Sequence, residues 1–503
     1  MGSSGDPPQI QGAASAGAPT DSVDVVIVGA GLSGIGAAVH LQRRCPSKTY
    51  AILEARGSIG GTWDLFRYPG VRSDSDMHTL GYSFRPWTNA NAIADGSAIR
   101  RYIVDTAREA GVDARIRFGH SVTAASWSSD SARWTIEVTR SGSETVMRFG
   151  CRFLYLCSGY YHYGSAYRPA FPDESSYGGE IVHPQFWREN LDYAGKRVIV
   201  IGSGATAITL IPEMAKRAAH VTMLQRSPSY VFNLPTVDAI AGRLRRWLPG
   251  RLAYLLVRMK NVLVGMAFFQ LARRRPEIAK SRLVRLVQQQ LPPGFDVAKH
   301  FTPRYNPWDQ RVCVVTDGDL FKAIASGAVS VVTDEIDAFT LGGMRLKSGS
   351  ELHADIVVVA TGLQLNLLGG IQFTVDGVEV RASDAMAYKG AMLSGVPNMA
   401  YTFGYTNASW TLKAELIANY VCRLIRHMDS HGHSIAMPRR DPAVALKPFL
   451  DFTSGYVVRA SSLLPKQGSR RPWKVYQNYF LDALTLRFGR IDDGVLKFAG
   501  NPT

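Results

Sequence analysis

The sequence carries two glycine-rich turns, each directly between an apolar strand and a helix, and this repetition constrains the fold most. The first turn, Gly29 to Gly34, reads GAGLSG and follows the apolar run 24–28. The second, Gly202 to Ala207, reads GSGATA and follows the strand expected at 197–201. Such a turn binds pyrophosphate at a helix N-terminus in dinucleotide-binding units. The chain is therefore predicted to be α/β, with two Rossmann-like domains.

The strand after the first turn indicates which nucleotide that unit binds. The apolar run 50–53 ends on Glu54, 20 residues after Gly34. A carboxylate there accepts hydrogen bonds from the adenosine ribose hydroxyls and repels a 2′-phosphate. The first unit is therefore predicted to bind FAD or NAD, and a plain strand-to-helix turn is the alternative.

The second unit differs at the corresponding strand end. The strand expected at 221–224 runs into Gln225, Arg226 and Ser227 and carries no acid. A guanidinium at this place can pair with a 2′-phosphate, which favours NADPH. An ordinary exposed arginine at a strand end is the alternative interpretation.

A chain with both sites is most simply a flavoprotein, and the cysteines narrow its class. Disulfide reductases share this plan, but the five cysteines are scattered and form no CxxC or CxxxxC pair. Electrons from the flavin are therefore expected to pass to O2. The cysteine pattern also predicts no metal site and a reduced, cytoplasmic compartment. Residues 1–20 are expected to form a disordered tail, and no apolar run is expected to span a bilayer.

A motif downstream of the first unit carries a resemblance to a known family. The run GGTW at 60–63 is followed by YPG at 68–70 and by Asp74. This spacing resembles a motif of the type I Baeyer–Villiger monooxygenases. Longer matching runs lie at 66–77, 305–311, 404–414 and 464–473.

The stretch between the two units resembles the fingerprint of the same family. Tyr177, Gly179, His183 and Trp187 stand in its spacing, with Tyr177 in place of the usual Phe and Arg188 in place of Pro or Asp. His183 and Trp187 are interpreted as structural linker residues. The resemblance covers the chain from Asp21 to the C-terminus.

The resemblance implies an NADPH domain inserted into a discontinuous FAD domain, with a basic helical insertion. The implied ranges are 21–158 and 385–503 for the FAD domain, 159–235 and 305–384 for the NADPH domain, and 236–304 for the insertion. The implied activity inserts one oxygen atom from O2 into ketones, giving esters or lactones, and oxidises sulfur in thioethers or thioamides, through a C4a-peroxyflavin. The alternatives are a flavin monooxygenase limited to N- or S-oxygenation, and a non-catalytic, membrane-surface nucleotide-binding protein.

The resemblance also implies residue roles. The residues expected around FAD are Gly29, Gly31, Ser33, Gly34, Glu54, Thr62, Trp63, Asp64, Leu65, Arg72, Ser73, Asp74 and Val122. Those expected around NADPH are Gly202, Ser203, Gly204, Ala205, Thr206, Ala207, Arg226 and Ser227. Many relatives carry Lys before the active-site arginine, where this chain has Gln310.

Arg311 is the implied catalytic residue, with Asp74 as the partner that positions it. Addition of an oxygen nucleophile to a ketone develops negative charge, which a fixed, permanently protonated guanidinium stabilises. Without the resemblance, Arg311 could equally be a surface or structural arginine. Trp410 and Asn407 are expected near the flavin by fold analogy, whereas Tyr160, Tyr161 and Tyr163 are interpreted as packing residues.

Net charge points to a further partner. Lysine and arginine number 57 against 41 acids, a formal charge of +16. The stretch 240–291 contains one acid, Glu277, and twelve bases: Arg243, Arg245, Arg246, Arg251, Arg258, Lys260, Arg273, Arg274, Arg275, Lys280, Arg282 and Arg285. Beside its apolar residues, this pattern fits either an anionic membrane surface or a solvated outer face. No nucleic-acid-binding module is present, so nucleic acid is not expected as a partner.

Overall fold

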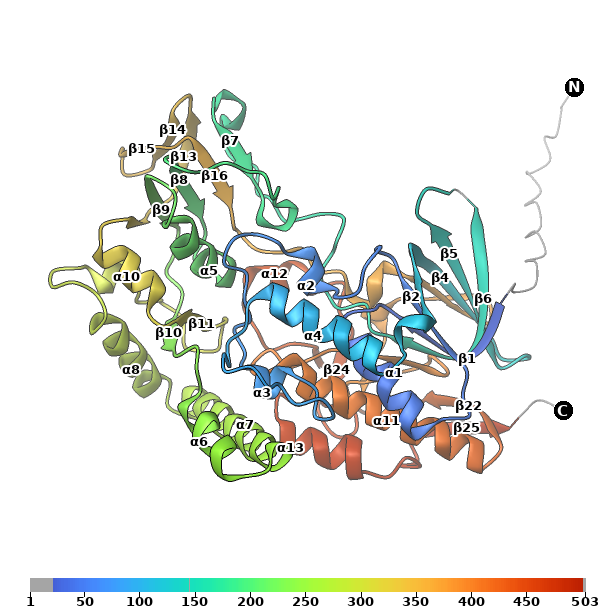
Figure 1. Ribbon diagram of the computed structural model, residues 1–503. Helices are drawn as coiled ribbons and strands as arrows, with labels where there is room; N and C mark the ends of the chain where they lie inside the picture. The colour runs from blue at the N-terminus through green and yellow to red at the C-terminus, as the bar shows by residue number, and fades with distance from the viewer. Residues whose placement is uncertain (1–20, 144, 501–503) are drawn as a thin grey trace, which may run out of the picture.

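The computed structural model describes residues 21–143 and 145–500, and the predicted tail 1–20 lies outside them. Figure 1 shows two sheet-centred units, one around β1, β2 and β6 and the other around β8, β9 and β16. Between them and below lie most of the helices. The predicted α/β class is confirmed.

The first unit is built on a parallel sheet in the order β21-β6-β1-β2-β3. These strands span Met399–Tyr401, Val146–Leu156, Asp21–Val28, Tyr50–Glu54 and Ile116–Phe118. The carboxyl half of β1 and all of β2 are buried, as expected of strands covered on both faces. A branch of the sheet continues from the first half of β6 through β5 (Arg133–Arg140), β4 (His120–Ser128), β17 (Gln372–Val375) and β18 (Val378–Val380). Its pairings are antiparallel except that between β4 and β17, which is parallel.

Two long helices pack on each other beside this sheet. The first, α1 (Leu32–Arg44), begins at the first glycine turn. The second, α11 (Trp410–Ser430), lies far along the chain from α1. The shorter helices nearby are α2 (Thr62–Leu65), α3 (Met77–Leu80), α4 (Gly96–Glu109), α12 (Gly455–Arg459) and α13 (Tyr479–Asp482).

The second unit has a five-stranded parallel sheet in the order β12-β9-β8-β16-β7. Its strands span Val329–Thr333, His220–Gln225, Arg197–Ile201, Ile356–Val359 and Glu180–Val182. Helices α5 (Ala205–Met214) and α10 (Asp319–Ala325) pack beside it. Smaller sheets join β10 (Val231–Leu234) to β11 (Cys313–Thr316), and β13 (Ile336–Thr340) to β14 (Gly343–Leu346) and β15 (Glu351–His353).

One predicted range differs from the sheet pairing. Residues 305–384 were expected in the NADPH domain, but β17 (Gln372–Val375) pairs with β4 in the first sheet, and β18 (Val378–Val380) pairs with β17 at its edge. The chain therefore returns to the first unit before 384. A sequence pattern marks a strand but not its partner, so this crossover was not readable in advance. Short pairs complete this part: β19 (Ala387–Tyr388) with β20 (Met392–Leu393), β22 (His433–Pro438) with β25 (Leu496–Gly500), and β23 (Leu446–Pro448) with β24 (Lys466–Gly468).

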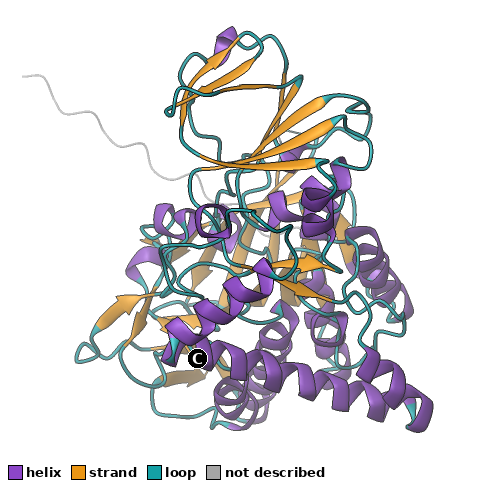
Figure 2. Cartoon of the chain, turned by 90° about the vertical axis from the view of Figure 1, so that its left-hand side faces the viewer, coloured by secondary structure: helices purple, strands orange, loops and turns teal. Residues whose placement is uncertain are grey.

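The predicted basic helical stretch forms three helices that Figure 2 shows along the lower part of the molecule. These are α6 (Ala239–Trp247), α7 (Gly250–Arg274) and α8 (Pro276–Gln288), followed by the short α9 (Val297–His300). No uninterrupted apolar run was expected to cross a bilayer, yet one helix of the described residues is long and apolar enough to do so by length and composition. That helix is α7, in which an 18-residue window holds only two charges, Arg258 and Lys260.

Candidate active site

A cavity of about 1090 Å³ lies where the two units meet. Both glycine turns line it, together with the ends of β2 and β9. It brings together most of the residues expected to bind the nucleotides or to act in catalysis: Gly29, Gly31, Ser33, Glu54, Thr62, Trp63, Arg72, Ser73, Asp74, Val122, Gly202, Ser203, Gly204, Ala205, Thr206, Arg226, Ser227 and Arg311. Ligand sites at the carboxyl ends of parallel strands follow this pattern.

The first glycine turn has the geometry that a pyrophosphate site requires. Gly29 has a φ of +100°, and a Cβ there would lie 2.7 Å from the carbonyl oxygen of Cys157 at the end of β6. A Cβ on Gly34 would lie 1.8 Å from the oxygen of Gly29. At Gly31 the nearest atom to such a Cβ is the Cα of Gly61, at 3.4 Å. Gly29 and Gly34 therefore fix the turn, and Gly31 leaves its backbone open to a phosphate.

Glu54 closes the ribose end of the first site. Its Oε2 accepts the Ala30 N–H at 2.6 Å, and its Oε1 accepts the Arg56 N–H at 2.8 Å. Burial raises the pKa of Glu54 despite these two hydrogen bonds. Each carboxylate oxygen has a second lone pair, which can accept a ribose hydroxyl. The residues present thus fit an adenosine dinucleotide without a 2′-phosphate.

The second turn repeats this construction against the other sheet. Gly202 has a φ of +137°, and a Cβ there would lie 2.4 Å from the oxygen of Ala360, after β16. No atom lies within 4 Å of a Cβ built on Gly204. Arg226 is exposed at the cavity edge and has no hydrogen bond or ion pair with the residues at 21–143 and 145–500. A free guanidinium at this strand end fits a 2′-phosphate.

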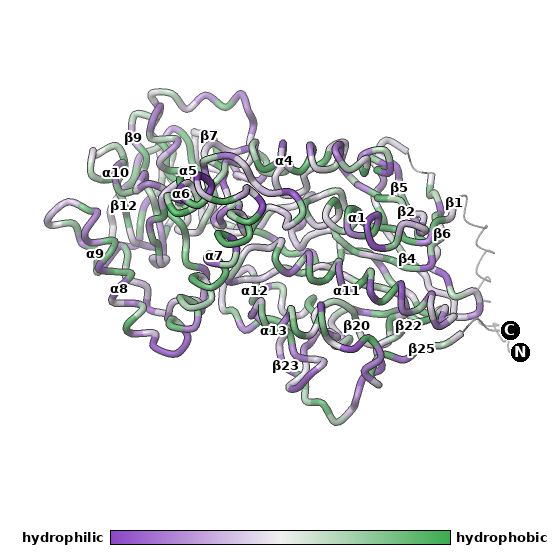
Figure 3. The backbone as a smooth tube through the Cα atoms, turned by 60° about the horizontal axis from the view of Figure 1, so that its bottom comes forward, coloured by the Kyte–Doolittle hydropathy of each residue, from purple (hydrophilic) through white to green (hydrophobic). Residues whose placement is uncertain are grey.

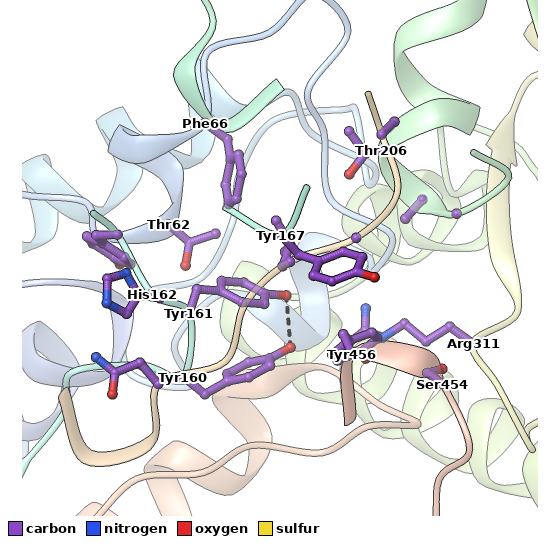
Figure 4. Close-up of a pocket in the computed structure, with 18 of the residues that line it drawn as sticks. Thr62, Phe66, Tyr160, Tyr161, His162, Tyr167, Thr206, Arg311, Ser454 and Tyr456 are labelled. Atoms are coloured by element: carbon purple, nitrogen blue, oxygen red, sulfur yellow. Dashed lines mark hydrogen bonds between the residues drawn. The ribbon is translucent and has the colours of Figure 1, made fainter. Parts of the chain in front are cut away.

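Arg311 lies in the cavity wall, immediately before β11, and is held by Asp74. Its Nη1 donates to the Asp74 Oδ2 at 2.8 Å. Although desolvation opposes the charge, Asp74 holds the pKa of Arg311 well above its usual range. Figure 4 shows the Arg311 side chain reaching toward Tyr456 of α12. The structure therefore places a permanent cation in the wall of the cavity that both glycine turns line.

A wall of aromatic side chains in the same cavity was missed by the sequence analysis. Tyr160, Tyr161 and Tyr163 follow the end of β6 and line the cavity, although packing was expected for them. The hydroxyl oxygens of Tyr160 and Tyr161 lie 2.9 Å apart, as the dashed line in Figure 4 shows. Their position after a parallel strand of a dinucleotide unit was the signal that could have identified them.

Trp410, which was expected near the flavin, lines the cavity beside these tyrosines, whereas Asn407 does not. Its ring stacks on Tyr160 with centroids 5.1 Å apart, and its Nε1 donates to the Ser33 Oγ at 2.7 Å. Asn407 does not line the cavity, because its amide nitrogen donates to the backbone oxygen of Gln477.

Four residues expected around the nucleotides do not line the cavity. Gly34, Leu65 and Ala207 are buried in the packing between strands and helices. Asp64 is fully buried and forms ion pairs with Arg56, Arg67 and Arg100. Burial opposes its charge, but hydrogen bonds from Ser58 and Arg56 and the charges of Arg56 and Arg100 lower the pKa of Asp64. Asp64 therefore anchors α2 from inside the protein.

Gln310 lines the cavity beside Arg311, as do Cys157 and Cys313, whereas the linker residues His183 and Trp187 do not. His183 accepts the Gln185 N–H on its Nδ1, and Trp187 packs against the core of the second unit. All five cysteines are buried and free. Within residues 21–143 and 145–500, no group of three or more metal-ligating side chains could hold a metal ion.

Comparisons with known proteins agree with this geometry. The profile of the flavin-binding monooxygenase-like family matches residues 90–392, and that of the NAD(P)-binding Rossmann-like domain matches residues 27–95. The FAD-containing monooxygenase EthA of Mycobacterium tuberculosis is 55% identical over 485 residues, which cover 96% of this chain and 99% of that protein.

Two solved structures share the fold. An oxidised steroid monooxygenase bound to NADP has a TM-score of 0.73 at 21% identity, covering 95% of this chain and 100% of that one. An open structure of cyclohexanone monooxygenase has the same TM-score at 19% identity, covering 96% and 100%. These matches confirm the predicted fold class, enzyme class and pair of cofactors. The chain thus belongs to the flavin-binding monooxygenase-like family and is a flavoprotein monooxygenase that uses FAD and NADPH.

Proposed function

We propose that this protein inserts one oxygen atom from O2 into ketones to give esters or lactones, and that it also oxidises sulfur in thioethers or thioamides. The observation that carries the proposal is the Arg311–Asp74 pair in the wall of a cavity lined by two dinucleotide turns. A flavoprotein that oxygenates only nitrogen or sulfur has less need of a fixed cation at this place.

The two cofactors have separate places in the cavity. Gly31, Ser33 and Glu54 would hold the adenosine half of FAD, and Thr62 and Trp63 line the same cavity. The second turn, with Arg226 and Ser227 at its open end, would hold NADPH. When bound, NADPH supplies the electrons and FAD the means of activating O2.

Arg311 then acts on charge that develops during the reaction. Attack of oxygen on a ketone carbonyl places negative charge on oxygen atoms, and a permanently protonated guanidinium nearby stabilises it. Asp74 keeps the guanidinium from rotating away. It does not remove the proton of Arg311, because arginine stays protonated in proteins. The residues of this chain thus supply a preorganised positive charge.

The aromatic wall is suited to hold an apolar substrate next to that charge. Tyr160, Tyr161 and Tyr456 surround Arg311, and burial raises the pKa of Tyr161 to about 12. Its hydroxyl therefore stays protonated at neutral pH and can donate a hydrogen bond to a substrate oxygen. Aromatic rings around a few polar groups are typical of pockets for small organic molecules.

A panel of ketones tests the proposal, with NADPH consumption and ester formation measured together. We expect ester or lactone from at least some ketones, in proportion to the NADPH consumed above the substrate-free rate. Thioethers in the same panel serve as the comparison. Oxygenation of sulfur with no ester from any ketone would leave the flavoprotein monooxygenase assignment intact but contradict this proposal.

Replacing Arg226 by alanine tests the assignment of the second site. Because an ionic contact to the 2′-phosphate is lost, we expect KM for NADPH to rise by about tenfold or more, with little change for NADH. Steady-state kinetics with both coenzymes measures this. Arg197→Ala, which removes an exposed cation of the same unit, is the control. An equal loss with both coenzymes would show that Arg226 does not read the phosphate.

A further inference from the structure

Helix α7 presents a continuous apolar stripe to solvent. The stripe consists of Leu252, Leu255, Leu256, Met259 and Leu263, each between 41% and 54% exposed. Their spacing of i, i+3, i+4, i+7 and i+11 places them on one face of the helix. A stripe with this spacing normally faces a core, and here it faces outward.

The opposite face of α7 is fixed to the first unit. The guanidinium of Arg258 is buried, donates to the carbonyl oxygens of His78 and Gly81, and pairs with Glu415 at 2.8 Å. Tyr254 donates to the oxygen of Tyr82. Although α7 is long and apolar enough to cross a membrane, and only 28% of its 18-residue apolar window is buried, leaving the protein would take Arg258 away from the buried carboxylate of Glu415. The helix can therefore lie on a membrane but not cross it.

The helices α6, α7 and α8, which include the stripe, carry many cations, and most of these have no partner among the residues that the structure describes. Of the twelve bases at 240–291, Arg245, Arg258, Lys260 and Arg273 are bound to other parts of the chain. Eight have no side-chain hydrogen bond or ion pair with the residues that the structure describes: Arg243, Arg246, Arg251, Arg274, Arg275, Lys280, Arg282 and Arg285. We call these eight the basic rim. The basic rim therefore supplies most of the positive charge of the segment 240–291 that no carboxylate of the described residues neutralises.

Trp247 gives this surface a feature typical of membrane interfaces. It ends α6, directly before the turn into α7, and is 85% exposed. Large exposed tryptophans are uncommon on surfaces that face only water, whereas they concentrate at the headgroup level of bilayers. Figure 3 brings this side of the molecule forward and shows hydrophobic and hydrophilic stretches together along α6, α7 and α8.

We propose that the face formed by the apolar stripe, Trp247 and the basic rim binds the surface of an anionic lipid bilayer. In this arrangement α7 lies in the plane of the interface, with the stripe among the acyl chains and the rim at the headgroups. Charge selects this occupant. A second copy of the chain would bring two basic rims together, which like-charge repulsion opposes.

Vesicle flotation of the FAD-loaded protein tests the proposal. We expect the protein to float with vesicles of phosphatidylcholine and phosphatidylglycerol, and to bind pure phosphatidylcholine vesicles at least tenfold more weakly. At about 1 M salt, where the Debye length is only about 3 Å, binding to the anionic vesicles should fall. Equal partition into both kinds of vesicle, or no flotation with either, would overturn the proposal.

Two variants separate the contributions of charge and of apolar contact. R246Q/R251Q/R274Q removes three charges of the basic rim, and we expect affinity for anionic vesicles to fall on the order of 10²-fold. L255Q/M259Q/L263Q removes the centre of the stripe and should weaken binding while leaving the salt dependence. Both sets lie at exposed positions, so far-ultraviolet circular dichroism and bound FAD should be unchanged.

Matched controls come from exposed positions of the first unit and the small sheet. R101Q/R108Q/R140Q removes the same charge from another face, and L341Q/V378Q removes exposed apolar side chains elsewhere. Both controls should bind like the wild type. If they lose as much binding as the test variants, the effect is one of net charge or general stickiness and not of this face. Self-association that the stripe variant abolishes, without vesicle binding, would instead assign the face to a second copy.

Discussion

Arg311→Ala is expected to lower ketone oxygenation by on the order of 10²-fold or more while the protein keeps its FAD. The size follows from removing a preorganised charge that stabilises a developing anion. FAD should remain because the structure places Arg311 with Asp74 and the aromatic wall, away from the first glycine turn and Glu54. Ester formation and flavin absorbance, measured on the same preparation, check both halves of this expectation.

Two comparisons make the Arg311 result specific. Asp74→Ala should give a milder loss, because it loosens the guanidinium without removing its charge. Oxidation of a thioether should be reduced less than ketone oxygenation in Arg311→Ala, because sulfur oxidation develops less negative charge at this site. NADPH consumption with release of hydrogen peroxide should persist. Near wild-type ester formation by Arg311→Ala would contradict the assigned role.

The two glycine turns should separate the two cofactors in a matched pair of variants. Gly31→Ala should weaken FAD binding by about tenfold or more, and Gly204→Ala should weaken NADPH binding to a similar extent. In each case the new methyl group would occupy space that a pyrophosphate needs. The protein itself has room for it, since the nearest atom to a Cβ is at 3.4 Å for Gly31 and beyond 4 Å for Gly204. Flavin retention and the KM for NADPH measure the two effects.

The controls for this pair lie in the same turns. Gly29→Ala and Gly202→Ala place a methyl group 2.7 Å and 2.4 Å from backbone oxygens at a positive φ, so both should reduce the yield of folded protein. Gly204→Ala should keep its flavin, and Gly31→Ala should keep its thermal stability when excess FAD is supplied. Loss of FAD from both Gly31→Ala and Gly204→Ala would show that the two turns do not bind separate cofactors.

The parts of the site that the sequence predicted are those whose residue type is set by the local backbone conformation or by a position at a strand end. Gly29 and Gly202 need positive φ, and Glu54 and Arg226 stand at strand ends whose position the βαβ unit fixes. Local chemistry therefore identifies these residues. Arg311 and Asp74 are 237 positions apart, and their pairing was expected only from the family resemblance, which the 2.8 Å contact matches.

The parts of the site that the sequence did not predict depend on where side chains point in the folded protein. Asp64 follows Thr62 and Trp63, which line the cavity, yet its side chain turns inward to three arginines that are near and far along the chain. Tyr160 and Tyr161 pack against hydrophobic clusters, as the sequence suggested, but they also line the cavity. That cavity exists only because the two units meet beside them, which the sequence does not indicate. The sequence at 240–291 predicted the net positive charge of this stretch, but not which of its bases bind other parts of the protein.

Oxygen insertion by the wild-type enzyme tests the central claim most directly. A ketone is incubated with NADPH under isotopically labelled O2, and the ester product is analysed by mass spectrometry. We expect each ester molecule to carry one labelled oxygen atom, at the position between the carbonyl carbon and the migrated carbon. When the reaction runs in labelled water under ordinary O2, no label should appear at that position. NADPH oxidation that yields only labelled hydrogen peroxide, with no labelled ester from any ketone, would contradict it.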